Sequence, residues 1–503
     1  MRKTLFIKNA LILTATSLAL RFAGIIFKVW LAKKIGSEGI GLYQLVFSVY
    51  VLASTFAISG TSTAVTRLVS EELALENPKG ALKILARAIQ ISLIIAFISV
   101  GILYCGADYI GKTILGDLRT VMAIKILPLS LPFIGISSCV RGYFIARRRI
   151  TPNALSQIFE QAVRIVIIYC LIAFFYEKGI AACCFAVILG DSIAEAFSCA
   201  FLYFSFVFDR KKLKKECSNS KNKPIIRRLL HISVPITLGR YLNTGLRTAE
   251  NILVPKNLAK YPKSSESALS QFGMIKGMAL PVLFFPSAIL NAVSTLLIPE
   301  ISEAVALKQN AVVQKACEKI FKITTLVGII FGAIFFTVGG EIANIIYKDE
   351  NVGFLLKALS PIVPLMYLDS ISDGILKGLD QQSFSFRTAV SDSSLRLILI
   401  LLLLPKTGLM GFILIMYLSN FFTCFLNVSR LLKISKVKIS LTKTVMMPTL
   451  AALSCTLLLK FVLLKLNVFG TVGFSVIFCV LSVFLYLGIL ITLKVVKKED
   501  FWH

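Results

Sequence analysis

Apolar runs of about 20 residues recur along the whole chain and are separated by short polar connections. A bilayer core ~30 Å thick requires apolar helices of this length, and a soluble domain does not need so many of them. We therefore predict an all-α, polytopic helical membrane protein with about 14 transmembrane helices. The predicted spans lie at roughly 9–32, 41–65, 84–107, 120–146, 153–176, 180–208, 229–254, 269–298, 318–340, 355–377, 384–404, 408–432, 443–464 and 470–493.

The first apolar run, from Ala10 to Trp30, carries charged side chains at Arg21 and Lys28 and has no small-residue cleavage site. A secretory signal would have an uncharged core followed by such a site. We therefore expect this run to be retained as the first transmembrane helix.

The chain is strongly basic, with 55 Lys and Arg residues against 26 Asp and Glu residues and a formal net charge of +29. In a soluble protein this excess would suggest nucleic acid, but here the basic residues gather in alternate connections between spans. Examples are the turn from Arg147 to Arg149 and the connection from Arg210 to Arg228. The positive-inside rule then predicts a multi-pass protein of the cell membrane with both termini in the cytoplasm. The predicted surroundings are the lipid bilayer, without a nucleic-acid partner.

The longest basic connection, from Asp209 to Arg228, contains Lys, Ser and Asn and little that could pack, which predicts a solvated linker. It divides the first twelve spans into six and six. We predict an N-terminal lobe at 1–208, a cytoplasmic linker at 209–228, a C-terminal lobe at 229–433, and two extra helices with a cytoplasmic tail at 434–503.

The two predicted lobes resemble each other in sequence. Four pairs of features occur in the same order: Arg21 and Arg240, Ser70-Glu71 and Ser302-Glu303, Arg141-Gly142 and Lys377-Gly378, and Arg164 and Arg396. Because six is an even number, both lobes enter the membrane from the same side, and the repeat is parallel. Folds of this kind place their substrate site between the halves, near the membrane midplane.

Arg21 lies near the middle of the first span, where an arginine that faces lipid costs ~2.5–3.5 kcal/mol. We expect it to face the cavity between the lobes, where a guanidinium can bind a diphosphate with two parallel hydrogen bonds. A buried ion pair or a snorkelling side chain would also accommodate it.

The seventh span carries a polar face formed by Arg240, Asn243 and Arg247, which follow one another at helical spacing. This face is too polar for lipid. It lines a water-filled path for substrate or belongs to a closed structural network.

Four polar residues flank the predicted turn between spans 4 and 5: Arg141, Glu160, Gln161 and Arg164. Glu160 and Arg164 are four residues apart and can pair on one helix face. Asp392 and Arg396 repeat this pair in the second lobe, which favours a structural role at the base of each lobe over contact with substrate.

Two pairs of acidic residues lie within apolar sequence, Asp191 with Glu195 and Asp369 with Asp373. Like charges at this spacing repel each other, so a proton or a cation could be held between them, which would suit H⁺ or Na⁺ coupling. Solvation at a helix end, or an undetected Lys or Arg partner, would also explain them.

No pattern in the sequence indicates catalysis. The chain has two histidines, no His/Cys spacing typical of a metal site, and no phosphate-binding loop for ATP. Its 11 cysteines are scattered through apolar segments and are expected to act as small packing residues. We predict a non-enzyme without a cofactor, whose energy comes from an ion gradient or from the substrate.

Several motifs resemble the stage V sporulation protein B family. They are Arg141-Gly142-Tyr143-Phe144, Thr151-Pro152, Ser156-Gln157, Glu160-Gln161, Arg164, and Pro299-Glu300-Ile301-Ser302-Glu303. That family belongs to the multidrug/oligosaccharidyl-lipid/polysaccharide (MOP) exporter superfamily, which includes lipid II flippases.

The resemblance implies two lobes around a V-shaped cavity that moves an undecaprenyl-linked saccharide outward by alternating access. Arg21 matches a cavity arginine of the related flippases, whereas their next basic residue has no strict match, since Phe27 and then Lys28 stand there. A sodium site in some relatives would correspond to Glu250 and Asp392.

The leading hypothesis is a flippase for a lipid-linked oligosaccharide, with a peptidoglycan precursor as substrate and envelope-synthesis proteins as possible partners. Arg21, Arg240 and Arg247 would bind the diphosphate, with Asn243 on the same face. The alternatives are flipping of another polysaccharide precursor, cation-coupled drug efflux by the same fold, and a scaffold that transports nothing.

Overall fold

The computed structural model describes residues 2–58, 60–211, 225–261, 265–288, 290–291, 301, 304–305, 307, 309–437, 440–466, 471–493 and 495. Ten of the described helices are long and apolar enough to cross a membrane. All described secondary structure is helical, as predicted, and the total of 14 spans remains a prediction.

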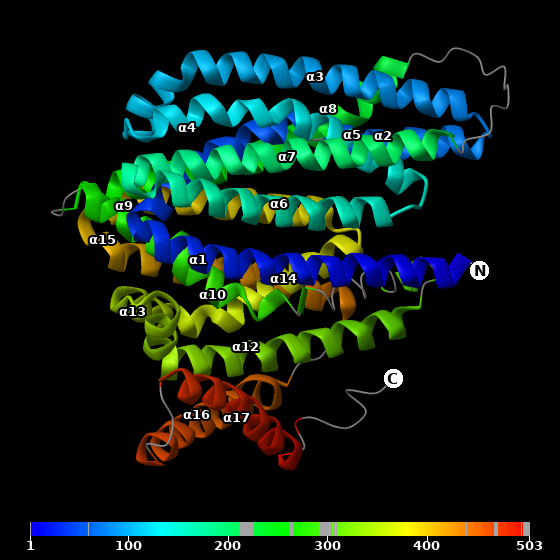
Figure 1. Ribbon diagram of the computed structural model, residues 1–503. Helices are drawn as coiled ribbons and strands as arrows, with labels where there is room; N and C mark the ends of the chain where they lie inside the picture. The colour runs from blue at the N-terminus through cyan, green and yellow to red at the C-terminus, as the bar shows by residue number, and fades with distance from the viewer. Residues whose placement is uncertain are drawn as a thin grey trace. The chain divides into compact units, whose positions relative to one another are not determined.

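The chain divides into two compact units, of which the first comprises residues 1–27, 38–259 and 264–270 and the second residues 28–37, 260–263 and 271–503. Helices of the first unit are α1 (Arg2–Ile58, which also enters the second unit), α2 (Thr61–Ala74), α3 (Pro78–Tyr109), α4 (Thr120–Ile126), α5 (Leu131–Ala146), α6 (Thr151–Phe175), α7 (Ile180–Lys211) and α8 (Ile225–Leu258). The long helices α3, α6 and α7 run roughly alongside one another in Figure 1.

The second unit is also built of helices. They are α9 (Ser265–Gly273, partly in the first unit), α10 (Leu280–Phe284), α12 (Asn310–Tyr347), α13 (Glu350–Leu359), α14 (Val363–Gly378), α15 (Gln382–Ser435), α16 (Met447–Leu466) and α17 (Thr471–Thr492). Short π-helical segments lie at Ile110–Leu115, Met274–Ala279 and Thr442–Met446, and short 3₁₀ segments at Leu127–Ser130, Tyr176–Lys178 and Ser360–Ile362.

Two helices are long enough to cross a bilayer twice. α1 has 57 residues and α15 has 54, and each is kinked at a glycine with positive φ, Gly36 (φ 70°) and Gly408 (φ 58°). L-residues with a side chain rarely adopt this backbone conformation, so glycine suits both positions. The kinks fall between predicted spans 1 and 2 and at the boundary of spans 11 and 12.

The predicted linker is shorter than its sequence suggested. α7 runs to Lys211 and α8 starts at Ile225, and Asp209 is buried inside α7. Asp209 accepts hydrogen bonds from Tyr143 Oη at 2.9 Å and from Arg149 Nη1 at 2.6 Å. Residues 212–224 lie outside the described part of the chain, as does the Ser302-Glu303 motif.

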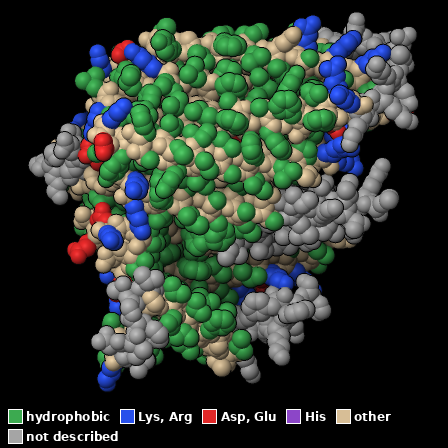
Figure 2. Space-filling view, viewed as in Figure 1, with side chains coloured by type: hydrophobic (Ala, Val, Ile, Leu, Met, Phe, Trp, Pro, Cys, Tyr) green, Lys and Arg blue, Asp and Glu red, His purple; other side chains and the backbone are tan. Residues whose placement is uncertain are grey.

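The core of the first unit lies between α2, α3 and α5. Its largest contributors include Leu68, Leu85, Tyr143 and Phe144, which are almost wholly buried. On the face seen in Figure 2, hydrophobic side chains cover the broad middle of this unit, and Lys and Arg gather towards its two ends. This is the distribution expected of a surface whose middle faces lipid.

A second core joins α12 to α16 and α17 in the second unit. Lys460 on α16 donates a hydrogen bond to the Thr337 carbonyl oxygen at 2.7 Å and pairs with Glu341 Oε1 at 2.8 Å. The two C-terminal helices are therefore attached to α12 by apolar packing and by a charged pair.

Candidate functional site

The polar face predicted on the seventh span lines a cavity in the first unit. The cavity has a volume of about 490 Å³ and lies between α8 and the second half of α1. We call it the cationic pocket. Its lining residues are Gln44, Phe47, Ser48, Val51, Ser54, Thr55 and Ile58 of α1, and Arg240, Asn243, Thr244, Arg247, Thr248 and Asn251 of α8.

Hydrogen bonds between threonines and α1 hold the two walls of the cationic pocket together. Thr248 Oγ1 donates to the Ser48 carbonyl oxygen at 3.1 Å, and both residues are buried. Thr55 Oγ1 and Thr244 Oγ1 lie 3.4 Å apart. These contacts fix the register of α8 against α1 and so place the polar face of α8 in the pocket.

The charge of the cationic pocket is positive, since Arg240 and Arg247 line it and no Asp or Glu is among its described lining residues. Both arginines are exposed, and about 10 Å of helix separates them, seven residues at ~1.5 Å each. Asn243 lies between them, and its buried Oδ1 has no hydrogen-bond partner among the described residues. The pocket can therefore bind an anionic ligand that also carries hydrogen-bonding groups.

Arg21 and Glu250 do not line the cationic pocket. Arg21 is exposed on the first half of α1, and Glu250 is buried on α8, one turn after Arg247. Their predicted roles in substrate binding and ion coupling remain predictions.

The residues around the α5–α6 turn form a closed network with α7. Arg141 Nη2 pairs with Glu160 Oε2 at 2.9 Å and donates to Ser198 Oγ at 3.2 Å. Arg164 pairs with Glu160 Oε1 at 2.9 Å, with Asp191 Oδ1 at 2.9 Å and, more distantly, with Glu195 Oε1 at 3.9 Å.

Arg164 also donates to Gln161 Oε1 at 3.1 Å, so all four residues predicted around this turn belong to one network. The pair Asp191 and Glu195 has a cationic partner that sequence spacing did not reveal. The arrangement favours the structural interpretation of this cluster.

Each residue of the signature Arg141-Gly142-Tyr143-Phe144 has a distinct packing role. A Cβ on Gly142 would lie 2.7 Å from the Ser62 carbonyl oxygen, so α2 and α5 approach too closely there for a larger residue. Thr66 Oγ1 donates to the Gly142 carbonyl oxygen across the same crossing at 3.1 Å. Tyr143 binds Asp209, and Phe144 fills the core.

The three aspartates predicted for ion coupling in the second unit each pair with a different side chain. Asp392 pairs with Arg396 at 3.2 Å and accepts a hydrogen bond from Ser419, so the repeated i, i+4 pair is formed in both units. Asp369 accepts from Asn427 Nδ2 at 2.8 Å, and Asp373 pairs with Lys377 at 2.5 Å. Among the described residues, no three His, Cys, Asp or Glu side chains are placed to hold a metal ion.

The sequence-based reasoning missed the α1 wall of the cationic pocket. Gln44, Ser48 and Thr55 lie on one face of a helix at spacings of four and seven residues, a pattern that could have identified this wall. It also missed Lys460, whose signal is a lysine inside a predicted apolar span.

Comparison with known proteins agrees with this fold. Residues 6–305 match the family model described as polysaccharide biosynthesis protein. The chain belongs to this family. Stage V sporulation protein B of Bacillus subtilis (strain 168) is 29% identical over 416 residues, which cover 82% of this chain and 80% of the relative.

Two solved structures share the fold of this member of the polysaccharide biosynthesis family. The lipid II flippase MurJ in an inward closed conformation matches with a TM-score of 0.72 at 16% identity, over 95% of this chain and 98% of MurJ. An inward-facing multidrug resistance MATE family transporter of the MOP superfamily matches with a TM-score of 0.66 at 12% identity, over 85% and 100%.

This chain is therefore a multi-pass membrane protein of the polysaccharide biosynthesis family, and it shares the fold of the MOP superfamily transporter. The two solved structures are those of a flippase and a transporter, and their likeness to this chain shows a shared fold.

Proposed function

We propose that this protein flips a lipid-linked oligosaccharide, in the first place a peptidoglycan precursor of the lipid II type, from the inner to the outer leaflet by alternating access. It acts in the cell membrane with both termini in the cytoplasm. The relative named as a lipid II flippase motivates this choice of substrate.

The observation that carries the proposal is the cationic pocket. A saccharide linked through a diphosphate brings two phosphates and many hydroxyl groups into the membrane. Arg240 and Arg247 provide guanidiniums for the phosphates, and the unpaired Oδ1 of Asn243 can accept a hydrogen bond from a sugar hydroxyl. In this proposal Arg21 contributes a further positive charge when the substrate enters.

Cation-coupled drug efflux is less well supported by the same pocket. A site for organic cations needs carboxylates and aromatic faces. The described lining contains one aromatic residue, Phe47, and no carboxylate, while it contains two arginines. Coupling to Na⁺ or H⁺ remains a separate proposal that concerns Glu250, Asp369, Asp373 and Asp392.

The test is transport by the purified protein in proteoliposomes, with a fluorescent undecaprenyl-diphosphate saccharide as the probe. Arg240→Ala and Arg247→Ala should each lower the initial rate roughly 10- to 100-fold, because a hydrogen bond to a charged group contributes ~1.5–3 kcal/mol. Arg227→Ala is the matched control, since Arg227 lies on the same helix and is exposed but does not line the cationic pocket.

Two results would contradict the proposal. One is full transport by the Arg240→Ala/Arg247→Ala double variant at normal protein levels. The other is a wild-type protein that moves organic cations but no lipid-linked saccharide under the same conditions.

A further inference from the structure

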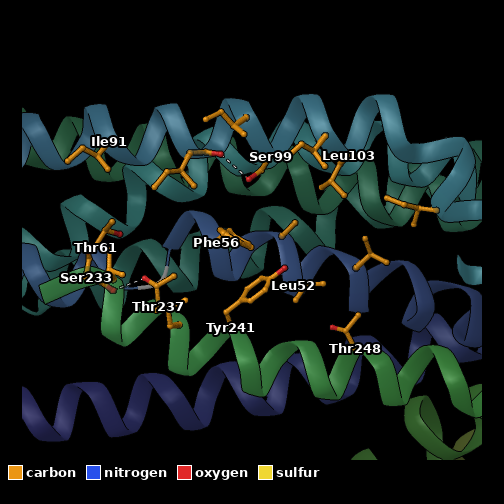
Figure 3. A pocket seen from close by; sticks show the side chains of 18 of the residues that line it. Leu52, Phe56, Thr61, Ile91, Ser99, Leu103, Ser233, Thr237, Tyr241 and Thr248 are labelled. Carbon is orange, nitrogen blue, oxygen red and sulfur yellow. Dashed lines mark hydrogen bonds between the residues drawn. The ribbon is translucent and has the colours of Figure 1, made fainter. Parts of the chain in front are cut away.

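A second cavity in the first unit lies between α3, α8 and the second half of α1. Its volume is about 760 Å³, and most of its 21 lining residues are aliphatic or aromatic. Figure 3 shows side chains from these helices pointing into it, with Ile91 and Leu103 on α3, Leu52 and Phe56 on α1, and Tyr241 on α8. We call this cavity the apolar trough.

Several of the hydroxyl groups that line the apolar trough donate hydrogen bonds to backbone carbonyl oxygens. Ser99 Oγ donates to the Ile95 carbonyl oxygen at 2.9 Å, and Thr237 Oγ1 donates to the Ser233 carbonyl oxygen at 2.8 Å. Thr248 donates to α1, as described above. Because these groups have partners, the trough suits a hydrocarbon and offers little to a polar ligand.

The apolar trough is about as long as the hydrocarbon core of a bilayer is thick. On α8 its lining runs from Leu230 to Ile252, and 22 steps of ~1.5 Å along the helix give about 33 Å. The hydrocarbon core of a bilayer is ~30 Å thick, so one leaflet accounts for about half of this length. A phospholipid chain reaches through a single leaflet, whereas a long isoprenoid chain can occupy the whole trough.

The apolar trough and the cationic pocket lie on two sides of the contact between α1 and α8. Thr248 lines both cavities. Between them lie the Thr55–Thr244 contact and the edge-to-face contact of the Phe56 and Tyr241 rings, whose centroids are 4.2 Å apart. An amphiphile with its diphosphate in the cationic pocket would therefore have an apolar channel beside it for its tail.

We propose that the apolar trough holds the isoprenoid chain of the transported lipid while its headgroup occupies the cationic pocket. The proposal rests on the function proposed above and adds a site for the lipid tail. It predicts that transport depends on the length of the chain as well as on the charged headgroup.

The first test compares an undecaprenyl-diphosphate saccharide with its short farnesyl analogue in proteoliposomes. Ser99→Phe places a ring in the middle of the trough and should lower the ratio of long-chain to short-chain transport about tenfold or more, since each buried methylene contributes ~0.8 kcal/mol. Gly101→Phe is the matched control, because Gly101 is exposed on α3, has no neighbour within 4 Å and does not line the trough. The control should keep the wild-type ratio.

The second test does not depend on transport. A photoreactive benzophenone side chain replaces Leu238, which lines the trough, and is irradiated with either the undecaprenyl probe or a labelled phospholipid. The proposal expects cross-linking to the undecaprenyl probe and its loss when Ser99→Phe is added.

The outcomes separate the two proposals. Cross-linking to phospholipid alone, or an unchanged chain-length ratio in Ser99→Phe, would overturn the tail site and leave the flippase proposal standing. Cross-linking of the undecaprenyl probe to the benzophenone variant, together with a wild-type protein that transports neither substrate, would support the tail site and overturn the flippase proposal.

Discussion

Arginine side chains occupy two kinds of surroundings in the first unit. Arg141 and Arg164 are partly buried and are held among three carboxylates by ion pairs. Arg240 and Arg247 are exposed in a pocket whose described lining has no carboxylate. A guanidinium that already has acidic partners has less capacity for a phosphate, so the second pair is better suited to substrate.

The first prediction concerns Arg164. Arg164→Ala removes the cation that pairs with Asp191, Glu195 and the Oε1 atom of Glu160. Removing one partner from a buried ion pair costs ~3–5 kcal/mol. We expect a large fall in thermal stability and in the yield of monodisperse protein in detergent. Arg67→Ala should change little, because its i, i+4 pair with Glu71 is exposed and such pairs contribute ~0.3–0.5 kcal/mol.

The same pair of variants separates the two interpretations of this cluster. An Arg164→Ala protein as stable as Arg67→Ala, yet unable to transport, would show that Arg164 contacts substrate and that the structural interpretation is wrong.

At the scale of helices, close crossings depend on small residues. α5 meets α2 at Gly142, and α12 meets the start of α14 at Gly328, where a Cβ would lie 2.8 Å from Pro364 Cα. Helices in membranes associate through such close backbone approach, because burial of apolar surface contributes little between lipid-solvated helices.

The second prediction tests the α2–α5 crossing. Gly142→Ala should lower the free energy of unfolding by ~1–3 kcal/mol, the usual cost of overpacking, because the backbone of α2 cannot move aside easily. Gly101→Ala should be neutral or slightly stabilising, since its new methyl group meets nothing within 4 Å and alanine favours helix. Thermal unfolding in detergent measures both, and equal midpoints would contradict the close-crossing argument.

Features set by residues close together in the sequence could be predicted, whereas contacts between separate helices could not. Apolar runs act locally, so the breaks between spans 1 and 2 and between spans 11 and 12, where the kinks at Gly36 and Gly408 lie, could be predicted. The i, i+4 pairs Glu160–Arg164 and Asp392–Arg396 were also predictable, because both partners lie on one helix. Ion pairs between helices, such as Arg164 with Asp191, depend on how the helices pack, and no pattern in a single sequence predicts that packing.

At the scale of the whole molecule, the repeated sequence features lead to related but unequal networks. In the first unit the arginine of the repeated pair also binds acids on α7, whereas in the second unit Ser419 and Asn427 occupy the facing helix segment and bind Asp392 and Asp369. The first network joins two guanidiniums to three carboxylates, whereas in the second Arg396 pairs with Asp392 and the neutral donors Ser419 and Asn427 supply contacts from the facing segment.

The third prediction concerns orientation in the membrane. Ala74→Cys lies at the end of α2, next to the α2–α3 turn, and Glu177→Cys lies in the α6–α7 connection, and both positions are exposed. With cytoplasmic termini, a membrane-impermeant maleimide should label Glu177→Cys in intact cells and Ala74→Cys only after permeabilisation. The parent chain gives the background from native cysteines, and the reverse pattern would contradict the proposed topology.

The ion pair between Lys460 and Glu341 has a consequence for biosynthesis. Lys460 is costly in lipid, and its partners on α12 precede it by more than 100 residues. Glu341 precedes Lys460 in the chain, so α12 is synthesised before α16 and already carries the acidic partner of the lysine. The pair therefore favours docking of α16 and α17 onto α12 in the order of translation.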